Sequence, residues 1–174
     1  MRVIGGEFRS RRLKSLPGLE TRPTPDRLRE TLFNVLATRL ADSVFMDIYA
    51  GTGAVGIEAL SRGARRCVFI EKNRRAVEVI HENLATLGLE SRAEVFSGTA
   101  AKLLERARAD MVFLDPPYEI SKEYEATMSA LDRAETPLAI AQHSSRAKLA
   151  DTYGSLSRYR IIKQGDNCLS FYAR

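Results

Sequence analysis

The sequence has 174 residues, of which 44% are hydrophobic and 28% charged, a composition ordinary for a soluble globular protein of one domain. Its 27 lysines and arginines outnumber its 22 acidic residues, which gives a formal net charge of +5. The N-terminus has no apolar signal region, and no stretch approaches the roughly 18 to 20 apolar residues needed to span a bilayer, so we expect neither secretion nor a membrane segment.

The first part of the chain is its most basic region. Residues 1–30 hold eight basic and four acidic residues, a net charge of +4. Residues 1–14 alternate around a Gly-Gly pair and predict a small hairpin or extended arm, followed by a loop over residues 15–23. Because clustered basic charge is typical of a polyanion binder, we interpret residues 1–23 as a nucleic-acid-binding extension of a domain over residues 24–174. The candidate phosphate contacts are Arg9, Arg11, Arg12, Lys14, Arg22, Arg27 and Arg29, and a solvated surface cation is the alternative for each.

A helix is predicted over residues 25–40. Thr24 can cap it, Pro25 suits the first helical position, and Asp26 suits the positive end of the helix dipole. Apolar residues at helical spacing follow.

Strands and helices then alternate along the chain. The apolar runs predict strands over residues 44–49, 66–71, 93–96, 110–114 and 137–142, with helices over 53–62, 73–87, 99–107 and 121–132. Two further strands, over 157–163 and 167–173, flank a turn and predict an antiparallel hairpin at one edge. This order predicts an α/β fold, with a mostly parallel seven-stranded sheet covered by helices on both faces.

The first predicted strand runs into a glycine-rich loop. Gly51, Gly53 and Gly56 lie between this strand and a helix, the arrangement that holds a nucleotide-like cofactor. Glu71 closes the second strand and can hold the hydroxyls of a ribose, in NAD or in S-adenosylmethionine alike. Asp47 favours the latter, since a carboxylate would repel a pyrophosphate and suits a cationic ammonium group.

Residues 115–118 read Asp-Pro-Pro-Tyr directly after the fourth predicted strand. Proline fixes φ and lacks an N–H, so this corner is rigid and rich in acceptors. It suits a planar ring that carries an exocyclic NH₂, with Asp115 and the Pro116 carbonyl accepting from the amine, Pro117 stiffening the corner and Tyr118 stacking on the ring. A turn with incidental prolines is the alternative.

Together these motifs resemble the RsmD family of bacterial small-subunit ribosomal RNA guanine-N2 methyltransferases. The similar segments cover residues 2–6, 21–34, 47–64, 115–118 and 165–172. The resemblance implies a Rossmann-like class I methyltransferase fold, S-adenosylmethionine as cofactor, and ribosomal RNA or the assembling small subunit as partner. It also implies methylation of the exocyclic N2 amine of a guanine. Many relatives carry an acid or amide near the end of the third strand, where this chain has Thr99, so the contact with the adenine amine is expected to be weaker.

Further roles follow for the cofactor end. Asp47 is expected to face the methionine ammonium, Glu71 the ribose and Lys72 the adenine, while Thr24 either caps its helix or faces the methionine carboxylate. Backbone groups are expected to line the methionine moiety at Tyr49, Ala50, Gly51, Thr52 and Gly53.

Two alternatives remain open on sequence alone. The same corner serves amino-methyltransferases that act on adenine N6 or cytosine N4 of DNA or RNA, and the same fold serves nucleotide-dependent oxidoreductases and non-catalytic RNA-binding modules. Cys67 and Cys168 lie far apart in apolar runs and predict buried thiols in a reducing compartment, hence a cytoplasmic protein. His81 and His143 lack metal-ligand spacing, so we expect no metal, and nothing in the sequence requires more than a monomer.

Overall fold

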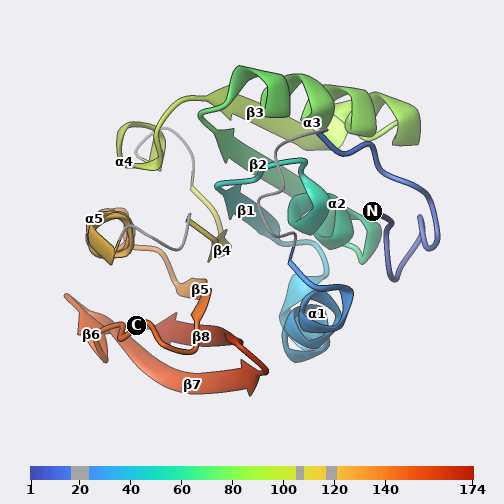
Figure 1. The fold of residues 1–174 in the computed structure, drawn as a ribbon. Helices are drawn as coiled ribbons and strands as arrows, with labels where there is room; N and C mark the ends of the chain where they lie inside the picture. Colours follow the sequence, from blue (N-terminus) through green and yellow to red (C-terminus); the bar gives the residue numbers. More distant parts are fainter. Residues whose placement is uncertain (17–23, 105–107, 117–120) are drawn as a thin grey trace.

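A single twisted sheet organises the protein (Figure 1). The computed structural model describes residues 1–16, 24–104, 108–116 and 121–174. Within these residues the sheet has eight strands in the order β3-β2-β1-β4-β5-β8-β7-β6. Their bounds are β1 Val44–Ile48, β2 Arg66–Glu71, β3 Ala93–Ser97, β4 Met111–Leu114, β5 Leu138–Ser144, β6 Thr152–Tyr153, β7 Leu156–Gln164 and β8 Asn167–Ala173.

The direction of the strands confirms the predicted α/β class. Strands β1 to β5 pair in parallel, and β8 pairs antiparallel with both β5 and β7. The two-residue strand β6 pairs with the start of β7 and was not predicted, because two residues carry no readable period. The strand order reverses at β1, with β2 and β3 on one side and β4 and β5 on the other, and such a switch point creates the crevice where α/β proteins bind ligands.

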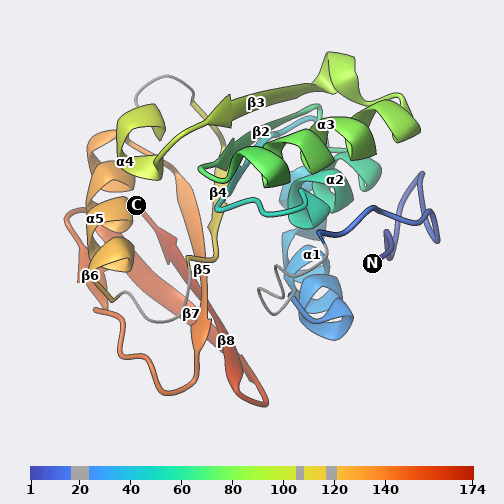
Figure 2. The same cartoon turned by 45° about the horizontal axis from the view of Figure 1, so that its top comes forward.

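Helices cover both faces of the sheet (Figure 2). Apolar side chains of α1 (Asp26–Leu40), α2 (Ala54–Ser61) and α3 (Arg74–Leu87) share one buried cluster with Phe45 and Phe69 of the sheet. Residues of α4 (Ala100–Leu103) and α5 (Ser121–Arg133) share the second cluster with Met46 and Val68. Successive residues of β1 thus enter opposite cores, as the period of a strand requires.

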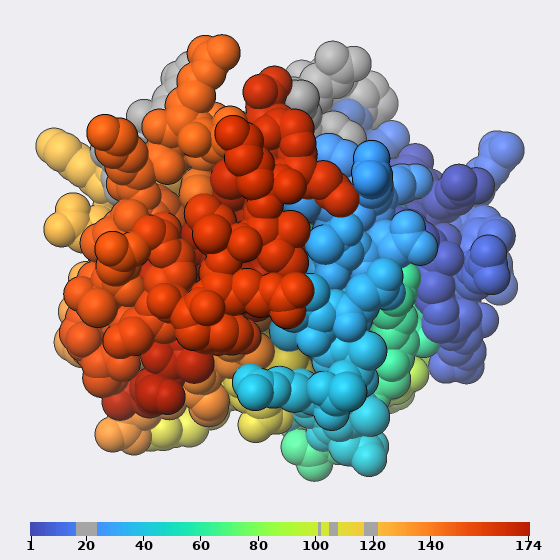
Figure 3. Space-filling view, turned by 90° about the horizontal axis from the view of Figure 1, so that it is seen from below, coloured from blue at the N-terminus to red at the C-terminus, as the bar shows by residue number. Residues whose placement is uncertain are grey.

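The helix termini match the sequence at one place and differ at another. Gly88 ends α3 in the left-handed conformation with φ 67°, as expected of a C-terminal glycine. At α1 the expected cap is wrong: Pro25 occupies the N-cap position, no side chain caps the helix, and Thr24 lies one residue further out. Along its length α1 lies beside the β7–β8 hairpin, where Gln164 donates to the Thr31 hydroxyl at 3.1 Å (Figure 3).

The first residues form an arm, residues 1–14, that packs on α2 and α3. A single antiparallel bridge joins Arg2 to Arg12, and Val3 and Leu13 are buried in the core beneath it. The backbone N–H groups of Ile4 and Gly5 both donate to the Glu58 carboxylate at 2.8 Å. The arm is therefore fixed to α2 by buried hydrogen bonds as well as by apolar contacts.

Candidate functional site at the carboxyl edge of the sheet

The carboxyl ends of β2, β1 and β4 bring the two sequence motifs together. Ile48 is in register with Ile70 of β2 and with Leu114 of β4. The next residues, Tyr49, Glu71 and Asp115, therefore leave three adjacent strands at the same edge. The glycine loop and Asp115, the first residue of the Asp-Pro-Pro-Tyr motif, are far apart in sequence and share one rim of the sheet.

The glycine loop is held by Glu71. One carboxylate oxygen of Glu71 accepts from the N–H of Gly51 and the other from the N–H of Asn73, each at 2.8 Å. Gly51 and Gly53 have φ values of 56° and 78°, a conformation that glycine adopts without strain. Space is open above Gly51, because a Cβ there would meet no atom of the described residues within 4 Å. A ligand can therefore approach this backbone closely.

The third glycine of the motif serves packing. A Cβ at Gly56 would overlap the ring of Phe69 and the sulfur of Cys67 on β2. The Gly56 N–H also donates to Asp47 at 2.8 Å. Gly56 thus brings the first turn of α2 flush against the sheet and orients the carboxylate at the end of β1.

Two carboxyl groups at the rim hold their protons unusually tightly. Burial raises the pKa of Asp47 to about 7; the N–H bond from Gly56 opposes the rise and the charge of Glu71 adds to it. Burial, followed by the charge of Asp47, raises the pKa of Asp115 to about 8, against the effect of the Thr24 hydroxyl. Thr24 donates to Asp115 at 3.5 Å, so the residue expected at the methionine carboxylate lies against the catalytic candidate.

Asp47, Glu71 and Asp115 gather three carboxyl groups at the rim, and this chemistry discriminates between cofactors. A cationic ligand is attracted to their ionised forms, whereas the negative charge of a pyrophosphate is repelled by them. S-adenosylmethionine carries a cationic sulfonium and an ammonium group, a ribose for Glu71 and a methionine chain that fits an open backbone at Gly51. The donor set therefore fits the cofactor predicted from the sequence.

The remaining cofactor candidates lie around this centre. Lys72 is exposed and forms an ion pair with Glu123 of α5 at 4.0 Å. The Tyr49 hydroxyl is hydrogen-bonded to Thr127 at 2.8 Å, and burial raises the pKa of Tyr49. Thr99 is exposed at the start of α4 and makes no capping bond. Ala50 is half-buried and Pro116 is buried at the rim, whereas Pro117 and Tyr118 lie outside the described residues.

Sequence reasoning missed Glu123 and Asn83. Glu123 follows the Asp-Pro-Pro-Tyr corner in α5, and its charge raises the pKa of Tyr49 from across the helix–sheet boundary. Asn83 is buried in α3, yet its side chain contacts both the arm and the glycine loop. The sequence did hold a signal for Asn83, because it is a polar residue on the apolar face of an amphipathic helix.

The basic candidates separate into two groups. Arg9, Arg11, Arg12, Lys14 and Arg27 are exposed and can reach a polyanion, while Arg22 lies outside the described residues. Arg29 is wrong as a phosphate contact, because it is fully buried. Its guanidinium donates to the Arg2 carbonyl at 2.7 Å and to Asp26 at 3.1 Å, so it serves the attachment of the arm.

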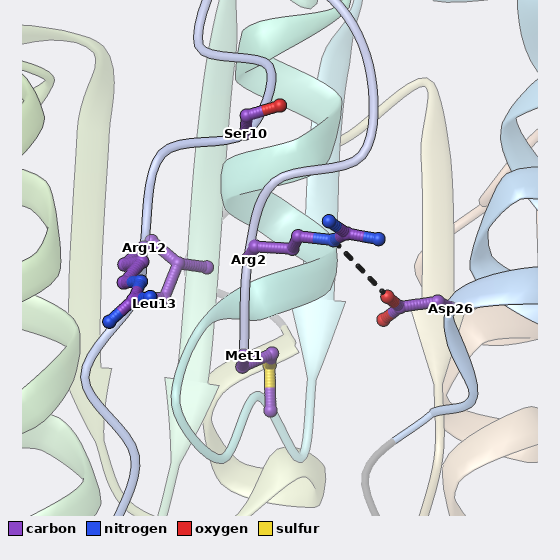
Figure 4. Close-up of a pocket in the computed structure, with 6 residues that line it drawn as sticks. All are labelled: Met1, Arg2, Ser10, Arg12, Leu13 and Asp26. Atoms are coloured by element: carbon purple, nitrogen blue, oxygen red, sulfur yellow. Dashed lines mark ion pairs between the residues drawn. The ribbon is translucent and has the colours of Figure 1, made fainter.

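An open hollow of about 720 Å³ separates the arm from the start of α1 (Figure 4). It is lined by Met1, Arg2, Ser10, Arg12, Leu13 and Asp26. Arg2 extends across it to Asp26, at 3.8 Å, and the sulfur of Met1 lies 3.7 Å from the Thr52 hydroxyl. The basic arm therefore borders the glycine loop directly.

The chain is similar over its whole length to a known protein family. The family model described as conserved hypothetical protein 95 (Cons_hypoth95) matches residues 1–173. A Bacillus subtilis protein named putative rRNA methyltransferase YlbH is 33% identical over 183 residues, which cover 100% of this chain and 99% of that protein.

Two matches from Escherichia coli extend this similarity, one to a named enzyme and one to a solved structure. Ribosomal RNA small subunit methyltransferase D is 43% identical over 121 residues, which cover 68% of this chain and 60% of that protein. The solved structure described as putative methyltransferase yhhF superposes with a TM-score of 0.86 at 35% identity, covering 100% of this chain and 97% of that one.

Proposed function

The chain belongs to the RsmD family, and from that premise we propose that it transfers a methyl group from S-adenosylmethionine to the exocyclic N2 amine of a guanine in small-subunit ribosomal RNA. The observation that carries the proposal is the common rim of the glycine loop and Asp115. One end of this rim suits a cationic methyl donor, and the other presents acceptors to an amine.

Binding of the donor prepares Asp115 for its role. A carboxyl group with a pKa of about 8 is mostly protonated at neutral pH and accepts an N–H poorly. S-adenosylmethionine supplies an electrophilic methyl group on a positively charged sulfur. Beside such a charge Asp115 and Asp47 would favour their ionised forms, and Asp115 would then accept an N–H bond.

Positioning of the amine supplies most of the catalysis. The lone pair of guanine N2 is delocalised into the ring, which makes it a poor nucleophile. The Asp115 carboxylate and the Pro116 carbonyl accept its two N–H bonds and aim the lone pair at the methyl group. Alignment of this kind is worth roughly 7 to 11 kcal/mol of barrier. As the C–N bond forms, the bond between sulfur and the methyl carbon would break and leave the neutral thioether S-adenosylhomocysteine, and the proton that N2 loses would pass to Asp115 or to water.

The chain's own residues fix the cofactor at the other end. Glu71 holds the Gly51 loop and retains lone pairs for the ribose hydroxyls. Lys72 would flank the adenine, and Asp47 would face the methionine ammonium directly or through water. The exposed cations Arg9, Arg11, Arg12, Lys14 and Arg27 contact the RNA backbone. We further propose that the enzyme acts as a cytoplasmic monomer.

The decisive experiment maps the product. Small ribosomal subunits lacking the modification are incubated with labelled S-adenosylmethionine, and the methylated nucleotide is identified. N2-methylguanine supports the proposal, whereas label on adenine N6 or cytosine N4 would assign the chain to another class of amino-methyltransferase. Tight binding of NAD in calorimetry, with no binding of S-adenosylmethionine, would exclude the proposed methyltransferase activity.

Substitution separates the two ends of the site. Asp115→Ala is expected to lower turnover on the order of 10² to 10³-fold even with saturating cofactor, because the lost interaction acts on the amine. Glu71→Ala serves as the matched variant and is expected to weaken cofactor binding without changing RNA affinity. Loss of cofactor binding in Asp115→Ala would show that its role is misassigned.

A further inference from the structure

We infer that Asn83 is a positioning residue that couples RNA binding on the arm to cofactor binding in the glycine loop. The inference rests on the proposed function for the identity of the two ligands. Its geometry is independent of that function, because it concerns one buried amide that contacts two separate segments of the chain.

Asn83 uses its whole amide group. Its Nδ2 donates to the Thr52 carbonyl at 3.1 Å and to the Lys14 carbonyl at 3.2 Å, and its Oδ1 accepts from the Lys14 N–H at 2.7 Å. The side chain is 2% exposed. A buried amide with three bonds in fixed directions holds its partners in one arrangement, since each lost bond leaves an unpaired buried group.

The two segments joined by Asn83 carry the two ligands. Lys14 is an exposed cation of the arm, and Thr52 lies between the two positive-φ glycines of the cofactor loop. The same face of α3 gives the arm two more supports: Lys14 pairs with Glu82 at 2.9 Å, and Arg11 donates to the Thr86 carbonyl at 3.4 Å. Of these three residues of α3, Asn83 alone also contacts the glycine loop.

In this arrangement RNA binding on the arm and cofactor binding in the glycine loop both require the Asn83 side chain to be ordered, so the loss of conformational entropy is shared between them. Contact of Arg11 and Lys14 with RNA phosphates holds the arm on α3, and the arm in turn holds the Asn83 side chain in place. The Thr52 carbonyl is then already fixed when the cofactor arrives, so the loop loses less freedom on binding. Coupling of this kind is reciprocal, so the cofactor strengthens RNA binding by the same factor.

The test compares affinities in four states. Binding of labelled S-adenosylhomocysteine, which cannot react, is measured with and without saturating unmethylated small ribosomal subunits. We expect the wild-type affinity to rise by at least about fivefold on addition of subunits. In Asn83→Asp, which keeps an acceptor for Lys14 but loses both donors, the ratio is expected to fall to about one, within twofold.

A neighbouring variant provides the matched control. Glu82→Gln removes an exposed arm contact on the adjacent residue and leaves the bond to Thr52, so its ratio is expected to match the wild type. Amide hydrogen exchange of residues 50–53 is expected to quicken in Asn83→Asp and not in Glu82→Gln. If Asn83→Asp unfolds, Asn83→Ser removes the same donors without adding a charge and is expected to give the same ratio.

The outcomes distinguish this inference from the proposed function. A wild-type enzyme that methylates subunits but shows a ratio of one would overturn the coupling alone. An Asn83 variant that keeps the wild-type ratio would do the same. Failure of the wild type to bind S-adenosylhomocysteine or subunits would overturn the proposed function, and the coupling with it.

Discussion

Individual carboxyl groups at the rim determine how the site responds to pH. Asp47 is 1% exposed and accepts one N–H, from Gly56, in the described structure. Asp115 has the Thr24 hydroxyl at 3.5 Å. Neither has a described cation beside it, so each keeps a proton that an exposed aspartate would lose. A folded pKa above the unfolded one stabilises the ligand-free protein at low pH, and this contribution is lost as pH rises towards 7 and 8.

Cofactor affinity is therefore expected to rise with pH. A cation binds the ionised carboxylates, so S-adenosylmethionine should bind more tightly between pH 6 and about 8, by up to about tenfold per unit for each proton released, and level off above. Calorimetry in buffers of different ionisation enthalpy counts the protons. Asp47→Asn is expected to release fewer of them. A flat affinity between pH 6 and 9 would contradict the shifted pKa values.

The contacts of Thr24 and Arg29 could not be predicted from residue identity alone. Thr-Pro-Asp is a common helix start, and an arginine on a basic segment is usually solvated. Both expectations failed because of distant partners: Asp115 draws Thr24, and the Arg2 carbonyl with Asp26 holds Arg29 in the core. Such contacts depend on tertiary structure that no local pattern encodes. The placement of Gly51, Glu71 and Asp115 at one edge of the sheet was predictable, because the ends of parallel strands fix it.

Among the elements, helix α2 contacts both the cofactor end of the sheet and the N-terminal arm. Its first turn supports Asp47 through Gly56, and its last turn holds the arm through Glu58. Glu58 is 0% exposed; it pairs with Arg62 at 2.7 Å and lies 3.9 Å from Arg29. The strands were predictable from their apolar runs, and α1 to α3 from their period. The arm was less so, because its few residues are ordered by α2 rather than by their own propensity.

Removal of the Glu58 carboxylate is expected to loosen this attachment. Glu58→Ala removes the only fully buried carboxylate described beside Arg29 and leaves the N–H groups of Ile4 and Gly5 unpaired, so we expect a loss of about 3 to 5 kcal/mol in the free energy of unfolding. Urea denaturation measures it. Glu94→Ala removes an exposed ion pair with Arg66 and should cost less than about 1 kcal/mol. Equal losses of stability in the two variants would show that the attachment of the arm by Glu58 contributes little.

On the scale of the whole molecule, the basic arm lies next to the candidate cofactor site. The arm lies on α2 and α3 and borders the glycine loop at Thr52. A net charge of +5 favours association with a polyanion, and we propose that the exposed cations of the arm fix where the RNA binds. The topology was predictable from the alternation of strands and helices, whereas the packing of the arm against the loop required the folded chain.

Salt dependence is expected to report the arm. The double substitution Arg11→Ala with Arg12→Ala removes two exposed cations, so the slope of log affinity against log salt for small-subunit RNA should fall by up to about 1.8 if both contact phosphates. Filter binding at several salt concentrations measures it. Arg39→Ala, at the far end of α1, is the control. An unchanged slope in the double variant would move the RNA surface to another part of the molecule.

The two ends of the described chain lie far apart on the molecule, and this decides where an affinity tag can be attached. Met1 lies 3.7 Å from the Thr52 hydroxyl, beside the reactive edge. Ala173 pairs with Leu138 at the start of β5, and Arg174 pairs with Asp132, on the far side of the sheet (Figure 1). An affinity tag joined ahead of Met1 would crowd the cofactor loop, whereas one joined after Arg174 would leave it open.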